Sequence, residues 1–163
     1  MNDKAEFIPD KFSFSGPEKD DYVCNKVIMC KGNFLRTEDH FIVFDNLTIL
    51  DTTTLLIWQK SVSNKQISFY DADTYINQLN QSQFAGYSDW RLPSLEELKT
   101  LLENKQMKGG YLINPVFDNM SNIFWSSTNS EGDGAWYFDF RDGSVLGMFK
   151  SRTYFVRAVR SGQ

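Results

Sequence analysis

The segment Asp89-Trp-Arg-Leu-Pro-Ser-Leu-Glu-Glu-Leu98 contains the clearest structural signal in the sequence. Ser94 and Glu97 have the spacing of a capping box, in which each side chain bonds a backbone N–H of the first helical turn. Pro93 stands just before this box. An apolar stripe follows at helical spacing: Leu95, Leu98, Leu101 and Leu102. The segment therefore predicts a helix that begins after Ser94 and packs one face against the rest of the protein.

A second helix is predicted just upstream, within Ser68–Gln81. Ser68 is a candidate N-cap, and Asp71 and Asp73 suit the positive end of a helix dipole. Four apolar residues recur at helical spacing: Ala72, Tyr75, Ile76 and Leu79.

Strands are predicted on both sides of these helices. Residues 22–60 hold the short runs VIMC, HFIVF, LTIL and LLIW, which are separated by turn residues. After a long loop over 104–123 come FWSST, AWYFDF and SVLGMF, with Asp142–Gly143 as a two-residue hairpin turn. TYFVRAVR (153–160) is apolar on both parities, which is typical of a central strand. The order indicates an α+β domain with two helices on one face of a mostly antiparallel sheet.

The chain has 163 residues, the length of one domain. We expect an extended arm over 1–21 and a single domain over 22–163. No run approaches the ~20 apolar residues of a membrane span, so membrane insertion is not expected. The N-terminus has no apolar signal region, which favours a cytoplasmic location on the sequence as given. The net charge of −4 disfavours nucleic-acid binding.

The charge is unevenly distributed, because residues 141–163 are basic. They hold one acid, Asp142, against five bases: Arg141, Lys150, Arg152, Arg157 and Arg160. These bases either serve local pairing or form an anion-binding edge.

No catalytic, metal or cofactor motif is recognisable, and the chain is not expected to be an enzyme. His40 is the only histidine and is predicted to be a surface residue. Cys24 and Cys30 are predicted to be separate thiols, since a bridge would need a turn near Asn25–Lys26. The segment 129–134 offers too few carboxylates for calcium and is predicted to be a plain loop.

Aromatic residues make up 15% of the chain. Trp90, Trp125 and Trp136 either stack on sugar rings or build the core; we predict the core, and the same for Trp58. An aromatic binding role is left to the remaining rings: Phe7, Phe12, Phe14, Tyr111, Phe149 and Tyr154.

Two arginines lie in apolar surroundings, where an unpaired guanidinium would be costly. Arg91 and Arg157 are therefore predicted to pair with carboxylates. The candidates are Asp89, Glu97 and Asp139.

Four pieces of the sequence, in order, resemble one bacterial family. They are Asp51-Thr-Thr-Thr-Leu-Leu-Ile-Trp-Gln59, the segment Gly86–Leu98, Phe124-Trp-Ser-Ser-Thr128, and Ala135-Trp-Tyr-Phe-Asp-Phe140 followed by Val156-Arg-Ala-Val-Arg160. Together they resemble the DUF1566 family, also named for the C-terminal domain of the Legionella collagen-like adhesin, over about residues 45–161. The resemblance implies a C-type-lectin-like fold, related to that of formylglycine-generating enzymes. It also implies a frequently exported domain and, from the adhesin, binding of sulfated glycans.

The chain departs from the family pattern at three places. Leu55 replaces the glycine of the family's T-G-L-x-W, so a turn that needs a positive φ would be strained or altered. Ile76 and Ala158 stand where many members carry a cysteine each, which suggests apolar packing in place of a disulfide and a reducing compartment. The late cysteine pair of the oxygenase relatives is missing, so their chemistry does not carry over.

These observations favour a non-catalytic binding module whose ligand is an anionic glycan or another acidic molecule. The candidate contacts lie in the late loops: Asn129, Asp133, Arg141, Lys150 and Arg152. The alternative is a protein–protein interaction subunit of a larger assembly, with Phe7, Phe12 and Phe14 of the arm as anchors. An enzyme of unassigned activity is the least favoured hypothesis, and the oligomeric state is left open.

Overall fold

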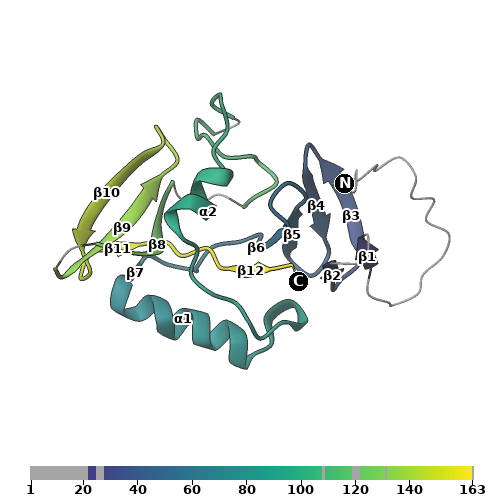
Figure 1. The fold of residues 1–163 in the computed structure, drawn as a ribbon, viewed down its shortest axis with the longest axis horizontal. Coiled ribbons are helices and arrows are strands. Elements are labelled where there is room, and N and C mark those ends of the chain that lie inside the picture. Colours follow the sequence, from purple (N-terminus) through teal and green to yellow (C-terminus); the bar gives the residue numbers. More distant parts are fainter. Residues whose placement is uncertain (1–21, 25–27, 108, 119–121, 131, 163) are drawn as a thin grey trace, which may run out of the picture.

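The computed structural model describes residues 22–162 except 25–27, 108, 119–121 and 131, so the predicted arm lies outside the described residues. The fold is α+β, with two helices packed on antiparallel sheets (Figure 1). The larger sheet has the order β12-β6-β5-β4-β3 and is built from β3 (Phe34–Glu38), β4 (Phe41–Phe44), β5 (Thr48–Asp51), β6 (Leu56–Gln59) and β12 (Val159–Ser161). The second has the order β10-β9-β8 and is built from β8 (Ile123–Asn129), β9 (Gly134–Asp139) and β10 (Ser144–Phe149).

Two small ladders complete the fold. β1 (Tyr22–Cys24) pairs with β2 (Ile28–Cys30), and β7 (Ile67–Ser68) pairs with β11 (Thr153–Tyr154). The register places Cys24 opposite Ile28 and Cys30 opposite Tyr22, so the two cysteines are not cross-strand partners.

Both predicted helices are confirmed. α1 spans Phe69–Gln81, and its N-cap Ser68 accepts a hydrogen bond from the backbone N–H of Asp71. α2 spans Leu95–Thr100 and starts with both hydrogen bonds of the Ser94–Glu97 capping box. These helices begin where the sequence predicts because N-cap contacts reach only three residues along the chain.

The helices cover opposite faces of the sheets, and this corrects the expectation that both lie on one face. The buried residues of α1 join one apolar cluster with Ile42, Leu50, Ile57, Trp125 and Tyr137. Those of α2 join a second cluster with Phe41, Val43, Trp58, Phe124 and Phe138. Alternate strand residues enter different clusters, because side chains alternate across a strand. All of β4 is consequently buried.

The tryptophans largely confirm their predicted core role. Trp58, Trp90 and Trp125 are at most 2% exposed, and Trp136 is partly buried against the second cluster. Of the remaining described rings, Tyr154 packs edge-on against Trp125 and at a tilt against Tyr137, with ring centroids 4.8 and 4.7 Å apart. Tyr111 is partly buried, whereas Phe149 is 70% exposed.

Two strand and turn predictions are corrected, and one strand was missed. β3 was not predicted, because FLRTE carries two charged residues and no clear alternation. The β9–β10 hairpin has a four-residue loop, 140–143, in which the Gly143 N–H donates to the Asp139 carbonyl, so Asp142–Gly143 is not a two-residue turn. The run 153–160 is split into β11 and β12, and β12 ends the order of the larger sheet.

The turn after β5 shows how the chain accommodates the missing glycine. The carboxylate of Asp51 accepts hydrogen bonds from the Thr53 and Thr54 backbone N–H groups and from the Thr54 hydroxyl. Leu55 keeps the left-handed conformation that a glycine would favour, with φ 61°. The turn therefore retains its geometry and carries the strain.

His40, predicted to be at the surface, lies beside this turn and is half-buried, with its Nε2 atom 3.9 Å from Asp51 Oδ1.

Candidate functional site

The motif segments that are far apart in the sequence meet through backbone hydrogen bonds. Arg91 and Val159 bond each other in both directions, at 2.9 and 3.0 Å. The Ser127 N–H donates to the Pro93 carbonyl at 2.7 Å, and the Trp125 N–H donates to the Phe155 carbonyl at 3.0 Å. The family-like residues thus form the structural centre of the domain.

Arginine–carboxylate pairs surround this centre. Arg91 makes a two-bond pair with Glu97 at 2.5 and 2.8 Å, which confirms its predicted pairing. Arg160 binds Asp89 in the same way at 2.6 and 2.9 Å, with its guanidinium 4.1 Å from the centroid of the Tyr87 ring. The hydrogen bond from Arg160 is the main reason that the pKa of Asp89 lies below its ordinary value.

Arg157 is buried, and the contacts that hold it differ from the prediction. Its guanidinium donates to the backbone carbonyls of Gln59, Lys60, Ser61 and Asp118. The three carboxylates proposed for it bind other arginines instead: Asp89 binds Arg160, Glu97 binds Arg91 and Asp139 binds Arg141. Burial lowers the pKa of Arg157 to about 9, so the group is still protonated at neutral pH. Arg157 therefore links the C-terminal segment to the end of β6, to the two residues after it, and to Asp118.

Four of the five predicted ligand contacts lie at one end of the β8–β9–β10 sheet. Asn129 ends β8, Asp133 immediately precedes β9, and Lys150 and Arg152 follow β10. The Lys150 N–H donates to the Asp133 carbonyl at 3.3 Å. Arg141 lies at the opposite end, beyond Asp139, where it makes a two-bond pair with that buried carboxylate. Six residues of strand separate the two ends, about 20 Å, so Arg141 does not belong to the same surface.

Two of these four contacts, Asp133 and Lys150, adjoin the N-terminal turn of α1. The hydroxyl of Tyr70 donates to both carboxylate oxygens of Asp133, at 2.7 and 2.9 Å. The Lys150 ammonium lies 5.6 Å from the centroid of the Phe69 ring, and the Lys150 backbone carbonyl accepts a hydrogen bond from the Phe69 N–H. Thr153, next to Arg152, pairs with Ser68.

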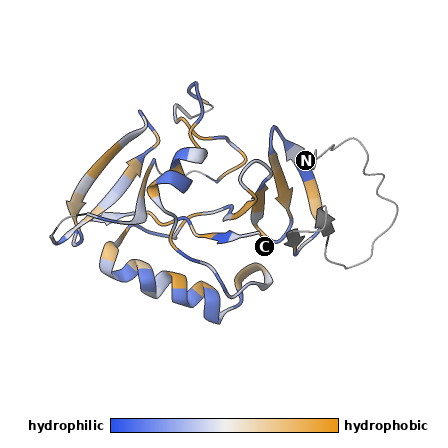
Figure 2. Cartoon of the chain, viewed as in Figure 1, coloured by the Kyte–Doolittle hydropathy of each residue, from blue (hydrophilic) through white to orange (hydrophobic). Residues whose placement is uncertain are grey.

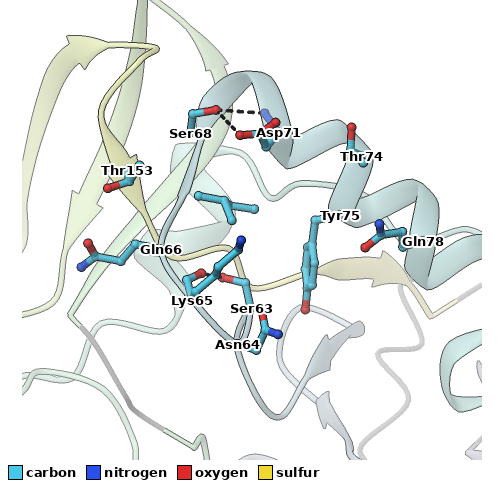
Figure 3. Close-up of a pocket in the computed structure, with 11 residues that line it drawn as sticks. Ser63, Asn64, Lys65, Gln66, Ser68, Asp71, Thr74, Tyr75, Gln78 and Thr153 are labelled. Atoms are coloured by element: carbon cyan, nitrogen blue, oxygen red, sulfur yellow. Dashed lines mark hydrogen bonds between the residues drawn. The ribbon is translucent and has the colours of Figure 1, made fainter.

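A groove of about 350 Å³ lies next to this β7–β11 ladder, and Ile67, Ser68 and Thr153 of the ladder contribute to its lining (Figure 3). One wall is the segment 63–68, and the other is the face of α1 that carries Asp71, Thr74, Tyr75 and Gln78. Tyr75 is half-buried, and its hydroxyl exchanges hydrogen bonds with the side chain of Gln59 at 2.7 and 3.0 Å. Burial is the main cause of the raised pKa of Tyr75. Its ring is therefore held in place as a fixed part of the groove.

Sequence reasoning missed this groove. The segment Ser63-Asn-Lys-Gln66 has no regular periodicity and reads as a linker. Tyr75 belongs to the predicted apolar stripe of α1, a periodicity that indicates a helix and gives no sign of a groove. Within the described residues, no three histidine, cysteine, aspartate or glutamate side chains are grouped as a metal ion would require.

A comparison with protein families identifies the family of this chain. The family model described as the Lcl C-terminal domain matches residues 47–160. The chain therefore belongs to the Lcl C-terminal domain family, the DUF1566 family. No curated protein matches the chain significantly. No described helix has the length and hydrophobicity that crossing a bilayer requires.

Proposed function

We propose that this domain is a non-catalytic binding module that holds an anionic glycan in the groove between segment 63–68 and α1. The observation that carries the proposal is the lining of the groove, which combines one fixed aromatic ring with many hydroxyl and amide groups. The polar groups belong to Ser63, Asn64, Gln66, Thr74, Gln78 and Thr153.

This lining matches the chemistry of a sugar. Amide and hydroxyl side chains both donate and accept hydrogen bonds, as the hydroxyls of a sugar do. Tyr75 and Ile67 give the groove an apolar surface between the polar groups, against which the C–H face of a sugar ring can pack. Binding sites commonly combine such an apolar surface with a few placed polar groups.

Two bases near the groove are available to an anionic substituent. Two acids are also nearby and keep their charge, because their partners are neutral hydroxyls: Asp71 accepts from Ser68, and Asp133 accepts from Tyr70. Within the described residues, the side chains of Lys65 and Arg152 make no hydrogen bond or ion pair. These two bases are available to a sulfate or carboxylate group.

The family supports the same ligand class. The resemblance to the Legionella adhesin implies sulfated glycans, and a C-type-lectin-like arrangement would place late loops beside the ligand. Arg152, one of the predicted contacts, directly precedes Thr153 of the groove, whereas Asn129, Asp133 and Lys150 are not among the lining residues.

A glycan array with a salt titration tests the proposal. We expect the full chain to bind anionic sugars at low salt and to lose them as salt screens the charges. For the strongest glycan, Lys65→Ala with Arg152→Ala should weaken binding about tenfold or more, and Gln78→Ala should weaken it at any salt concentration. Lys99→Ala is the matched control, because Lys99 is an exposed base on α2 that pairs with Glu96. The proposal fails if no anionic sugar binds at low salt, or if the control weakens binding as much as the groove variants do.

A further inference from the structure

The strand β10 is an open sheet edge. It ends the order β10-β9-β8, and within the described residues no strand pairs with its outer side. The opposite edge strand, β8, forms a bridge through Phe124 to Phe155, and its Trp125 N–H donates to the Phe155 carbonyl. An unpaired edge exposes a row of backbone donors and acceptors to another chain.

The open edge of the larger sheet is protected in ways that β10 is not. β3 carries a register shift between Phe34 and Arg36, and its Arg36 and Glu38 side chains form an exposed ion pair. Bulges and charges are the usual devices that prevent edge-to-edge pairing. β10 reads Ser-Val-Leu-Gly-Met-Phe and has neither a charge nor a bulge against β9. The same chain therefore protects one edge and leaves the other able to pair.

The register shows which backbone groups of β10 face outward. The Lys150 N–H points at the Asp133 carbonyl of the β9 side. Because bonding alternates along an antiparallel ladder, Leu146 and Met148 also direct their backbone groups toward β9, and Val145 and Gly147 direct theirs outward. The Phe149 carbonyl already accepts from the Arg152 N–H. The available edge is therefore centred on Leu146.

Apolar side chains accompany this edge. Leu146 is 47% exposed and Phe149 is 70% exposed, the largest exposed fraction among the large apolar side chains of the described residues. Figure 2 shows hydrophobic colour along β10. Burial of this area would supply the apolar contribution that strand pairing alone lacks.

We propose that two copies of this chain associate through antiparallel pairing of their β10 strands about a two-fold axis at Leu146. Each Val145 would then exchange backbone hydrogen bonds with Gly147 of the partner subunit. The two Leu146 side chains would lie directly opposite each other. Phe149 would face Gly143 of the partner subunit, beside the partially exposed Leu102 side chain that packs against that glycine.

The charges at the two ends of β10 suit this arrangement. Asp142 lies at one end, where the charge of Arg141 is already matched by Asp139. Lys150 lies at the other end. Antiparallel pairing centred on Leu146 brings Asp142 opposite Lys150 of the partner subunit at both ends of the interface. A symmetric dimer needs a patch that complements itself, and β10 has this property.

The dimer proposal is tested independently of the glycan proposal, because the dimerisation assay measures only the mass of the chain in solution. Analytical ultracentrifugation of the full chain over a concentration series should show a monomer–dimer equilibrium. Leu146→Lys should weaken dimerisation more than about tenfold, since like charges would be directly opposite each other. Leu35→Lys, which changes an exposed leucine on the protected edge β3, should leave the equilibrium unchanged.

Two further variants test the register. Leu146→Cys should form a reducible covalent dimer on mild oxidation, because directly opposed residues of a non-hydrogen-bonded pair lie at disulfide distance, whereas Leu35→Cys should not. Asp142→Lys and Lys150→Asp should each weaken the dimer, and the two together should restore it. A wild-type chain that remains monomeric at every concentration overturns the proposal, as does a dimer that Leu146→Lys leaves intact.

Discussion

Arg91 and Val159 join two of the family-like segments, Gly86–Leu98 and Val156–Arg160. Their backbones exchange hydrogen bonds of 2.9 and 3.0 Å although 68 positions separate them. The Arg91 guanidinium then reaches Glu97, whose carboxylate also caps α2 by accepting from the Ser94 N–H. The motif is therefore explained by structure: it fixes the start of α2 against the C-terminal strand.

Glu97→Ala should destabilise the domain by about 1–2 kcal/mol, because it removes one half of the capping box and the partner of Arg91. Glu97→Gln should cost less, since an amide oxygen still accepts from the Ser94 N–H. Urea unfolding followed by tryptophan fluorescence measures both. Glu96→Ala is the control, because Glu96 is an exposed neighbour that pairs with Lys99 at the surface, and its change should stay within about 0.5 kcal/mol.

Arg157→Met should destabilise the domain by about 3–5 kcal/mol, because four carbonyls would lose a buried charged donor. Arg157→Lys should also be strongly destabilising, since a single ammonium cannot reproduce the planar fork of a guanidinium. Thermal unfolding followed by circular dichroism is the measurement. Arg152→Met changes an exposed arginine and should be nearly neutral; equal losses for the two arginines would contradict the assigned role of Arg157.

Leu55→Gly should stabilise the domain by about 0.5–1 kcal/mol. Leu55 has φ 61°, a conformation that costs a residue with a Cβ atom roughly 1–2 kcal/mol and a glycine almost nothing. Part of this gain is offset by the larger entropy of glycine in the unfolded chain. Leu35→Gly, at an exposed leucine within β3, should instead be destabilising. A drop in stability for Leu55→Gly would show that the turn is not strained.

The domain should lose stability in acid through its arginine-bound carboxylates. Arg160 lowers the pKa of Asp89; for Asp139, burial acts to raise the pKa but hydrogen bonds from Arg141 and Asn122 outweigh it, and the net shift is also downward. Both pKa values in the folded state lie below the ordinary 3.8. At pH values between 3.8 and these lowered pKa values, the unfolded chain therefore binds more protons than the folded chain. The stabilisation is complete above pH 3.8 and is lost as the pH falls through the lower folded-state values.

Melting temperatures from neutral pH down to about pH 3 check this. Asp89→Asn and Asp139→Asn should lower the melting temperature at neutral pH and flatten the acid limb of the curve. An acid limb with the same slope in the wild type and in both variants would show that other groups cause the loss.

The parts of the fold predicted from sequence depend on neighbours a few residues apart. Ser68, Ser94 and Glu97 make their capping contacts within three positions. The turn at Asp51 is likewise made by residues that follow it directly. By contrast, TYFVRAVR shows apolar residues at both parities and was expected to be one strand. Its division into β11 and β12 depends on β7, β6 and Arg91, which pair with its two ends.

The candidate site was predicted only in part for the same reason. One end of the β8–β9–β10 sheet carries four of the predicted contacts: Asn129 and Asp133 in the β8–β9 connection, and Lys150 and Arg152 directly after β10. Arg141 has similar chemistry and a similar position in the sequence, but the length of β9 and β10 carries it to the other end.

The sequence by itself therefore determined the family, the two helices, most strands and the aromatic core, because periodicity, capping and motif order are local properties. Only the tertiary structure decided which polar groups face one another. The groove joins residues 63–68, one face of α1 and Thr153, and the unprotected edge of β10 exists because no other described strand reaches it. Both features depend on how distant segments meet, and no short stretch of sequence encodes that.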